Sequence, residues 1–310
     1  MPQAQAEGAK ASKNKRRIQI LKYKIFKYKI RKSVNRKIKE MNAQYIERIE
    51  IDTLWNGHKH ICWDLQPDIN ILSGVNGVGK STILNRVIMH LLEIDKMERK
   101  NDGVHLTFYP AEAKSIDFDV IRSFDRPMLS SELMNKVTDV QLQTELDLQI
   151  YQLQRKWLDY QVNLSNRMVE LFTSQVPDAA EKVQELAKEK THFQDIVDEL
   201  FSETGKTIKR NCNEIFFDSY GETIPPYKLS SGEKQMLIIL LTVLIQNKRP
   251  FVLFMDEPEV SLHIEWQQRL LDILTDLNPN VQVILTTHSP AVIMNGWSDK
   301  VTDVEDIEVK

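Results

Sequence analysis

Residues 74–81 read Gly74-Val75-Asn76-Gly77-Val78-Gly79-Lys80-Ser81, which has the form G-x-x-x-x-G-K-S. A run with strand character over residues 69–73 leads into this motif, and an apolar-periodic segment over residues 82–92 follows it. In a strand–loop–helix context, glycines let successive backbone N–H groups surround a phosphate, and the helix start adds its dipole. The motif therefore predicts a phosphate-binding loop.

The loop supplies several candidate nucleotide ligands. Lys80 is placed to reach the β- and γ-phosphates, and the Ser81 hydroxyl is placed to coordinate Mg²⁺. An ordinary structural loop is the alternative at this point. The residues expected to bind the nucleotide here are Gly74, Asn76, Gly77, Gly79, Lys80, Ser81 and Thr82.

Composition restricts the class of protein. A chain of 310 residues with 42% hydrophobic content can form one large domain or two ordinary ones. Cys62 and Cys212 are far apart in the sequence and lack a C-x-x-C partner, which favours a reducing, cytoplasmic compartment over a disulfide framework or zinc site. No apolar run reaches the roughly 18 to 20 residues of a membrane span, and no signal-peptide pattern is present. We therefore expect a cytoplasmic protein that does not contact a membrane.

Charge is distributed unevenly along the chain. Residues 1–40 carry 14 Lys and Arg against two Glu, a net charge of +12, so the rest sums to −15 within a total of −3. Residues 1–42 are therefore expected to form a basic, partly disordered N-terminal arm. Aromatic residues interleave with the basic ones over residues 15–32, which suits binding of nucleic acid or an acidic partner. The alternative is an extra helix whose charges are merely solvated.

The remaining chain divides by its periodicity. Residues 43–129 hold strand candidates at 44–51, 60–65, 104–109 and 115–123 and form the first nucleotide-binding lobe. Residues 130–204 carry helical apolar stripes interrupted at Pro177 and are expected to be an inserted helical hairpin or subdomain, its second helix capped by Asp178 and Glu181. Residues 205–310 complete the second lobe. Gly205-Lys206-Thr207 has a G-K-T ending but no preceding strand, so we assign it to a turn.

The first lobe contains one pair of histidines with a spacing that could bind a metal. His58 and His60 form an H-x-H pair, but no further ligand lies near them in the sequence. Ordinary strand residues are the favoured interpretation.

Three further motifs follow the helical segment. Leu229-Ser230-Ser231-Gly232-Glu233-Lys234-Gln235 precedes an apolar helix over residues 236–245, and alone it indicates a loop with a helix cap. Phe251-Val252-Leu253-Phe254-Met255-Asp256-Glu257-Pro258 is a buried-strand pattern that ends in two carboxylates, where ligands bind in open α/β sheets. Residues 281–290 form another apolar strand, which ends in Thr287-His288-Ser289-Pro290.

Taken together, the four motifs resemble those of ABC-type ATPases. Residues 229–235 are similar to the signature motif, except that Ser231 stands where the family usually has glycine; residues 251–258 resemble the Walker B motif, and 259–263 the D-loop. The resemblance implies that Asp256 and Ser81 hold Mg²⁺, that Glu257 orients the attacking water, and that His288 contacts the γ-phosphate beside Lys80. It also implies contact of Ser230, Ser231, Gly232 and Glu233 with ATP bound to a second copy.

The fold implied by this resemblance is α/β: a P-loop ATPase head with a mainly parallel sheet, an antiparallel β subdomain and an inserted helical subdomain. Two family elements stay unassigned. Gln141 and Gln143 are candidates for the Q-loop residue, and Trp55 and Trp63 are weak candidates for stacking on adenine.

The details of the motifs favour the Rad50, RecF and SMC branch, and compact ATPases of anti-phage systems such as Septu, PARIS and the OLD-like group. The signature has Glu233 after its glycine, and Ser261-Leu262-His263 and His288-Ser289-Pro290 replace the usual transporter sequences. We therefore expect an ATP- and Mg²⁺-dependent homodimer or higher homo-oligomer that senses a signal for a separately encoded effector, a nuclease or toxin, in defence or in DNA repair. A nucleotide-binding subunit of an ABC transporter is the alternative, and a non-hydrolysing scaffold is a third possibility.

Overall fold

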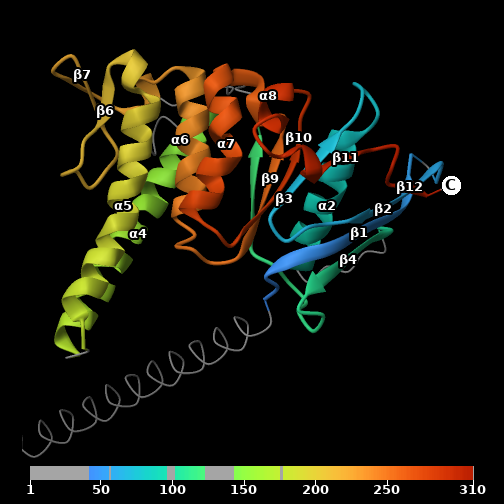
Figure 1. The fold of residues 1–310 in the computed structure, drawn as a ribbon, viewed down its shortest axis with the longest axis horizontal. Coiled ribbons are helices and arrows are strands. Elements are labelled where there is room, and N and C mark those ends of the chain that lie inside the picture. The colour runs from blue at the N-terminus through green and yellow to red at the C-terminus, as the bar shows by residue number, and fades with distance from the viewer. Residues whose placement is uncertain (1–41, 56, 96–101, 123–142, 175–176, 310) are drawn as a thin grey trace, which may run out of the picture.

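The computed structural model describes residues 42–55, 57–95, 102–122, 143–174 and 177–309. These residues form a central parallel sheet with helices on one face, and one helix and an antiparallel sheet on the other (Figure 1). The basic N-terminal arm lies outside the described residues except for Asn42, as does Gln141. No helix within the described residues combines the length and apolarity needed to cross a membrane.

The parallel sheet places the site. Its strand order is β11-β3-β10-β9-β5, and every neighbouring pair is parallel, so the carboxyl ends of the strands meet at one edge. Side chains of β9 alternate between two hydrophobic clusters, with Val252 and Phe254 on one face and Leu253 and Met255 on the other. The strands are β3 (Ile69–Ser73), β5 (Phe118–Arg122), β9 (Phe251–Asp256), β10 (Val281–Thr286) and β11 (Val301–Asp303).

One face of this sheet carries helix α2 (Lys80–Asp95) and the antiparallel sheet. The antiparallel sheet has the order β12-β2-β1-β4 and shares a hydrophobic cluster with α2 and with Val252 and Phe254. Its strands are β1 (Tyr45–Leu54), β2 (Lys59–Asp64), β4 (Val104–Tyr109) and β12 (Glu308–Val309). The second core therefore fixes the antiparallel sheet beside the phosphate loop.

The other face is covered by helices α4 (Glu145–Thr173), α5 (Ala179–Leu200), α6 (Ser231–Leu244) and α7 (Ile264–Leu277). A small antiparallel sheet follows α5, with strands β6 (Lys206–Ile208), β7 (Phe217–Ser219) and β8 (Glu222–Ile224). Short helices complete the chain: α8 (Pro290–Ile293) and the 3-10 helices η1 (Ser202–Thr204), η2 (Pro226–Lys228), η3 (Pro258–Ser261) and η4 (Ser298–Lys300).

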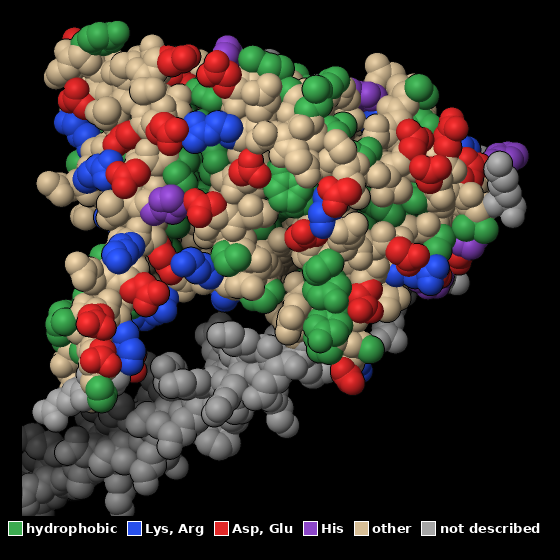
Figure 2. All heavy atoms as spheres, viewed as in Figure 1, with side chains coloured by type: hydrophobic (Ala, Val, Ile, Leu, Met, Phe, Trp, Pro, Cys, Tyr) green, Lys and Arg blue, Asp and Glu red, His purple; other side chains and the backbone are tan. Residues whose placement is uncertain are grey.

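Helices α4 and α5 pair along their length and project beyond the rest of the fold (Figure 1). Acidic and basic side chains intersperse along this hairpin (Figure 2). Its base is not separate from the core, because residues of both helices share one hydrophobic cluster with α6, α7 and β9. The α/β fold class is confirmed, while the exact division at residues 129/130 and 204/205 stays a prediction.

Several local predictions were wrong. Asp178 is the N-cap residue of α5, as predicted, but its backbone is left-handed at φ 63° and its side chain makes no capping hydrogen bond. The capping box of the hairpin lies at the start of α4, between Thr144 and Asp147. Only Gly205 of the G-K-T sequence ends a helix, and Lys206 begins β6. Helix α6 begins at Ser231 rather than at Met236, so the signature motif forms its first turn.

Candidate active site

The phosphate loop connects β3 to α2, as predicted, and α2 begins at Lys80. Gly79 has a φ of 109°, and a Cβ atom there would lie 2.3 Å from the Trp55 ring. The left-handed backbone favours glycine here, and the absence of a side chain leaves room for the Trp55 ring. Asn76 and Gly77 form an exposed turn, and Thr82 is exposed in the first turn of α2, so these predicted ligands are accessible to a nucleotide.

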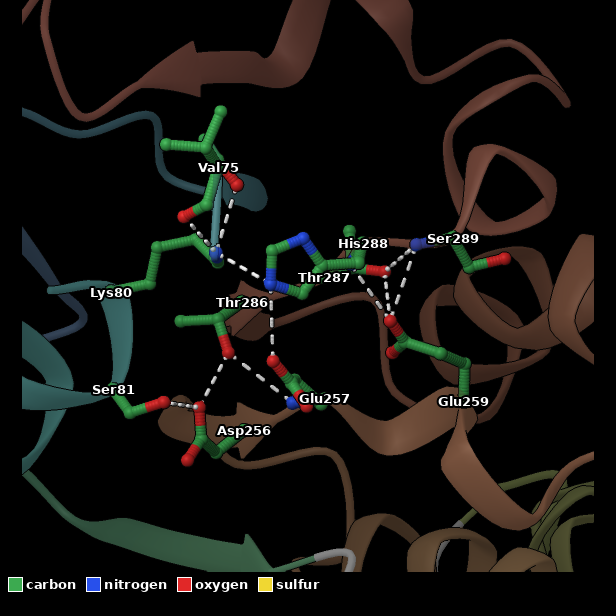
Figure 3. A network of polar contacts seen from close by, with 11 residues as sticks. Val75, Lys80, Ser81, Asp256, Glu257, Glu259, Thr286, Thr287, His288 and Ser289 are labelled. Carbon is green, nitrogen blue, oxygen red and sulfur yellow. Dashed lines mark hydrogen bonds and ion pairs between the residues drawn. The ribbon is translucent and has the colours of Figure 1, made fainter. Parts of the chain in front are cut away.

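Lys80 is buried but held by several acceptors. Its Nζ atom donates to the carbonyl oxygens of Gly74 and Val75, at 2.9 and 3.3 Å, and lies 2.6 Å from Nε2 of His288 (Figure 3). Desolvation by burial lowers the pKa of Lys80, although the Glu257 carboxylate acts in the opposite direction. Lys80 thus lies in the centre of the predicted site.

Ser81 and Asp256 come from opposite sides of the site and meet directly. The Ser81 hydroxyl donates to Oδ1 of Asp256 at 2.8 Å, and the Thr286 hydroxyl donates to the same oxygen at 2.6 Å (Figure 3). A serine hydroxyl and a carboxylate are hard oxygen ligands of the kind that Mg²⁺ prefers. The donor set therefore fits the metal predicted for these two residues.

Glu257 and His288 extend from adjacent strands β9 and β10. Oε1 of Glu257 lies 3.2 Å from Nε2 of His288, the same nitrogen that faces Lys80. The backbone of Glu257 is left-handed, with φ 48° and ψ 55°, and its N–H donates to the carbonyl and hydroxyl oxygens of Thr286. Such strain in a non-glycine residue is found mainly at functional sites, where the surrounding structure maintains it. The five predicted catalytic and metal-binding residues therefore converge.

The signature residues form a different surface. Ser230 caps α6 in a reciprocal capping box with Glu233, so the simpler interpretation as a helix cap is also correct. Ser230 and Ser231 are exposed, while Glu233 is buried and accepts hydrogen bonds from Lys206 and Thr204 at 2.8 and 2.7 Å. The contacts of Ser230 and Glu233 thus lead toward the base of the hairpin rather than toward Lys80.

Gly232 has a structural requirement of its own. A Cβ atom at this position would lie 2.4 Å from the backbone carbonyl oxygen of Ser261. The glycine therefore permits the first turn of α6 to approach η3, the D-loop segment. Contact within one chain is sufficient to explain this glycine.

Several residues of the site were missed in the sequence. Glu259 is 9% exposed and contacts the turn that carries His288; Lys234 is ion-paired with Asp147 at 2.8 Å. A third acid two residues after the Walker B pair was the available signal for Glu259. For Lys234 and Lys206 the sequence held no signal, because their partners are distant in the chain.

The two candidates for stacking on adenine differ in their exposure. Trp63 is 2% exposed in the core below the antiparallel sheet, so this weak candidate is not accessible to an adenine base. Trp55 is 39% exposed beside Gly79 and remains the candidate. Gln143 precedes α4 and donates its backbone N–H to Asp147. His60 and His105 flank Asp52 on the antiparallel sheet.

A family model described as "AAA domain, putative AbiEii toxin, Type IV TA system" matches residues 149–295. The "Retron Vc95 probable ATPase" of Vibrio cholerae serotype O1 biovar El Tor is 28% identical over 101 residues, which cover 29% of this chain and 20% of that protein. The "Retron Ec83 probable ATPase" of Escherichia coli is 32% identical over 96 residues, covering 27% and 18%.

The matches to this family model and to the two retron ATPases confirm the resemblance to ABC-type and defence ATPases that was predicted from the motifs. The matches span only about a fifth of the length of the retron ATPases. Among solved structures, the Smc head bound to the C-winged helix domain of ScpA is 15% identical with a TM-score of 0.47, covering 81% of this chain and 91% of that one.

Proposed function

We propose that the chain binds and hydrolyses ATP in the presence of Mg²⁺. The observation that carries this proposal is the convergence of Lys80, Ser81, Asp256, Glu257 and His288 at the carboxyl edge of the parallel sheet. These are the residue types that phosphoryl transfer requires, because the reaction depends on positioning and charge stabilisation. The similarity to proteins named probable ATPases supports the same chemistry.

Each residue has a role that its contacts support. The amides of residues 74–81 and the Lys80 ammonium bind the phosphates. Ser81 and Asp256 would hold Mg²⁺, which when bound neutralises charge on the phosphate oxygens. Glu257 accepts a proton from the attacking water and orients it, and His288 adds a hydrogen bond toward the γ-phosphate. Trp55 is positioned beside the loop to stack on the base.

We further propose that two copies close around ATP. Ser230 and Ser231 are exposed at the start of α6, where a second copy can reach them. Large apolar residues are exposed on the phosphate loop, on η3, at the start of α7 and at the end of α8, as expected for a face that a second copy covers. They are Val75, Val260, Ile264 and Met294, which are 52–76% exposed.

The biological role that fits best is a cytoplasmic sensor or switch for a separately encoded effector, in anti-phage defence or in DNA maintenance. The hairpin of α4 and α5 is available to bind an effector. The basic arm is available to bind nucleic acid or an acidic partner. The name of the matching family model, which includes a toxin and a toxin–antitoxin system, supports defence.

Dimer formation tests the proposal. Light scattering of the full chain with Glu257→Gln, Mg²⁺ and ATP should give twice the monomer mass, whereas the same variant without nucleotide should be monomeric. A monomer under both conditions would contradict the composite site. A transporter subunit, the second candidate, would instead purify with a membrane protein from its native operon.

A further inference from the structure

Glu259 connects the two strand ends that carry the catalytic residues. It lies on η3, directly after the β9 strand that carries Asp256, and it is 9% exposed. Its Oε1 atom accepts the Thr287 hydroxyl at 2.5 Å, the His288 N–H at 2.9 Å and the Ser289 N–H at 3.3 Å (Figure 3). One carboxylate oxygen therefore binds three successive donors of the turn after β10.

These hydrogen bonds fix the backbone conformation at His288. The Ser289 N–H also donates to the Thr287 hydroxyl at 2.9 Å, so this hydroxyl and Glu259 together close the turn. Hydrogen bonds that backbone N–H groups donate to a carboxylate are about twice as strong as those between neutral groups. The orientation of the imidazole follows from this backbone, and its Nε2 atom lies between Lys80 and Glu257.

The segment that carries Glu259 is itself braced from α7. Gln267 donates to the carbonyl oxygens of Glu259 and Leu262 at 3.3 and 2.8 Å, and its own carbonyl accepts the Ser289 hydroxyl at 2.6 Å. The D-loop segment and the histidine turn are thus held as one unit, so a displacement of either would displace the other.

We propose that Glu259 is the positioning residue that holds His288 in its catalytic orientation. This inference rests on the proposed ATPase function. The carboxylate is directed into the turn rather than toward the phosphate loop, and its Oε2 atom is buried without a hydrogen-bond partner among the described residues. Glu259 acts through its acceptor oxygen and not as a second base. An amide at this position can replace the acceptor, whereas a methyl group cannot.

The test compares Glu259→Ala and Glu259→Gln in the full chain, with exposed Glu112 changed to Ala as the matched control. We expect Glu259→Ala to lower kcat by about 10- to 100-fold, the loss typical of a misplaced group, with the Kd for a non-hydrolysable ATP analogue within about threefold of wild type. Glu259→Gln should restore kcat to within about fivefold. The control should match wild type.

Equal losses in both variants would show that the negative charge is required and would overturn the proposal. So would a wild-type kcat in Glu259→Ala, or a loss confined to nucleotide binding. If Glu259→Ala fails to fold, Thr287→Val provides the second variant, and we expect a kcat loss of about three- to tenfold. An unchanged kcat there would also overturn it.

Hydrogen exchange separates this inference from the ATPase proposal, because it requires no hydrolysis. The amides of His288 and Ser289 should exchange faster in Glu259→Ala, or in Thr287→Val for Ser289, than in wild type. A wild type without ATPase activity would refute the proposed function alone. Unchanged exchange at these amides would refute the role of Glu259.

Discussion

Nζ of Lys80 and Nε2 of His288 lie 2.6 Å apart, and the same histidine nitrogen lies 3.2 Å from Oε1 of Glu257. Nε2 can accept a hydrogen bond from the ammonium or donate one to the carboxylate, depending on its protonation. Binding of phosphate to Lys80 would therefore favour the second arrangement. The site is a connected set of polar groups rather than three independent side chains.

Lys80→Met should abolish phosphate binding without lowering stability. Burial lowers the pKa of Lys80, so at neutral pH the charged ammonium costs free energy in the folded state, a cost relieved only as pH rises through its folded-state pKa. Differential scanning fluorimetry should show an equal or higher Tm for the variant at pH 7, and no ATP-induced shift. Lys300→Met, which removes an ion pair with Asp68, is the control and should not be stabilised. A Tm several degrees below wild type for Lys80→Met would contradict this prediction.

The ion pair between Lys234 and Asp147 should contribute more than the other contacts of the hairpin. Both side chains are nearly buried, at 10% and 4% exposure, and they join the first turn of α6 to the first turn of α4. Lys234→Met leaves a buried carboxylate without its counter-charge, which costs about 3–5 kcal/mol in unfolding free energy.

The exposed pair of Arg269 and Glu199 between α7 and α5 provides the control. Arg269→Met should cost less than about 1 kcal/mol by chemical denaturation. Adding Asp147→Asn to Lys234→Met should recover part of the lost stability. Similar costs for the two single variants would show that the buried pair has no special role.

Glu233 should stabilise the fold in a pH-dependent way. Burial raises the pKa of this carboxyl, but hydrogen bonds from Lys206, Thr204 and Ser230 outweigh burial, and the pKa is lowered overall. A lowered folded-state pKa contributes stability that is present above the unfolded value of about 4.5 and is lost as pH falls through the folded value.

Thermal melting of Glu233→Gln should therefore show a lower Tm than wild type at pH 7. The unfolding free energy of the variant should be lower by roughly 1–3 kcal/mol. The difference should narrow as the pH falls through the lowered folded-state pKa of Glu233 and the wild-type carboxyl takes up a proton. A difference that does not depend on pH would place the contribution of Glu233 in packing instead.

The sequence was sufficient to predict the catalytic residues of the site, but not the buried polar contacts that stabilise the structure around them. The phosphate loop, β9 and β10 have contiguous patterns, and parallel strands bring their ends together, so Lys80, Asp256 and His288 could be predicted to meet. The partners of Glu233 and Lys234 lie 27 and 87 residues away, and only tertiary packing unites them. The left-handed backbone of Asp178, without a side-chain capping hydrogen bond, was likewise not predictable from the capping pattern.

The most direct test is steady-state phosphate release by the full chain with Mg²⁺ and ATP, comparing wild type with Glu257→Gln. We predict Mg²⁺-dependent turnover in wild type. In the variant we predict that turnover falls by about 100-fold or more while ATP binding is retained, because the amide cannot accept a proton from water. Glu112→Gln should behave as wild type. Unchanged turnover in Glu257→Gln would contradict the assignment of the catalytic base and the proposed mechanism.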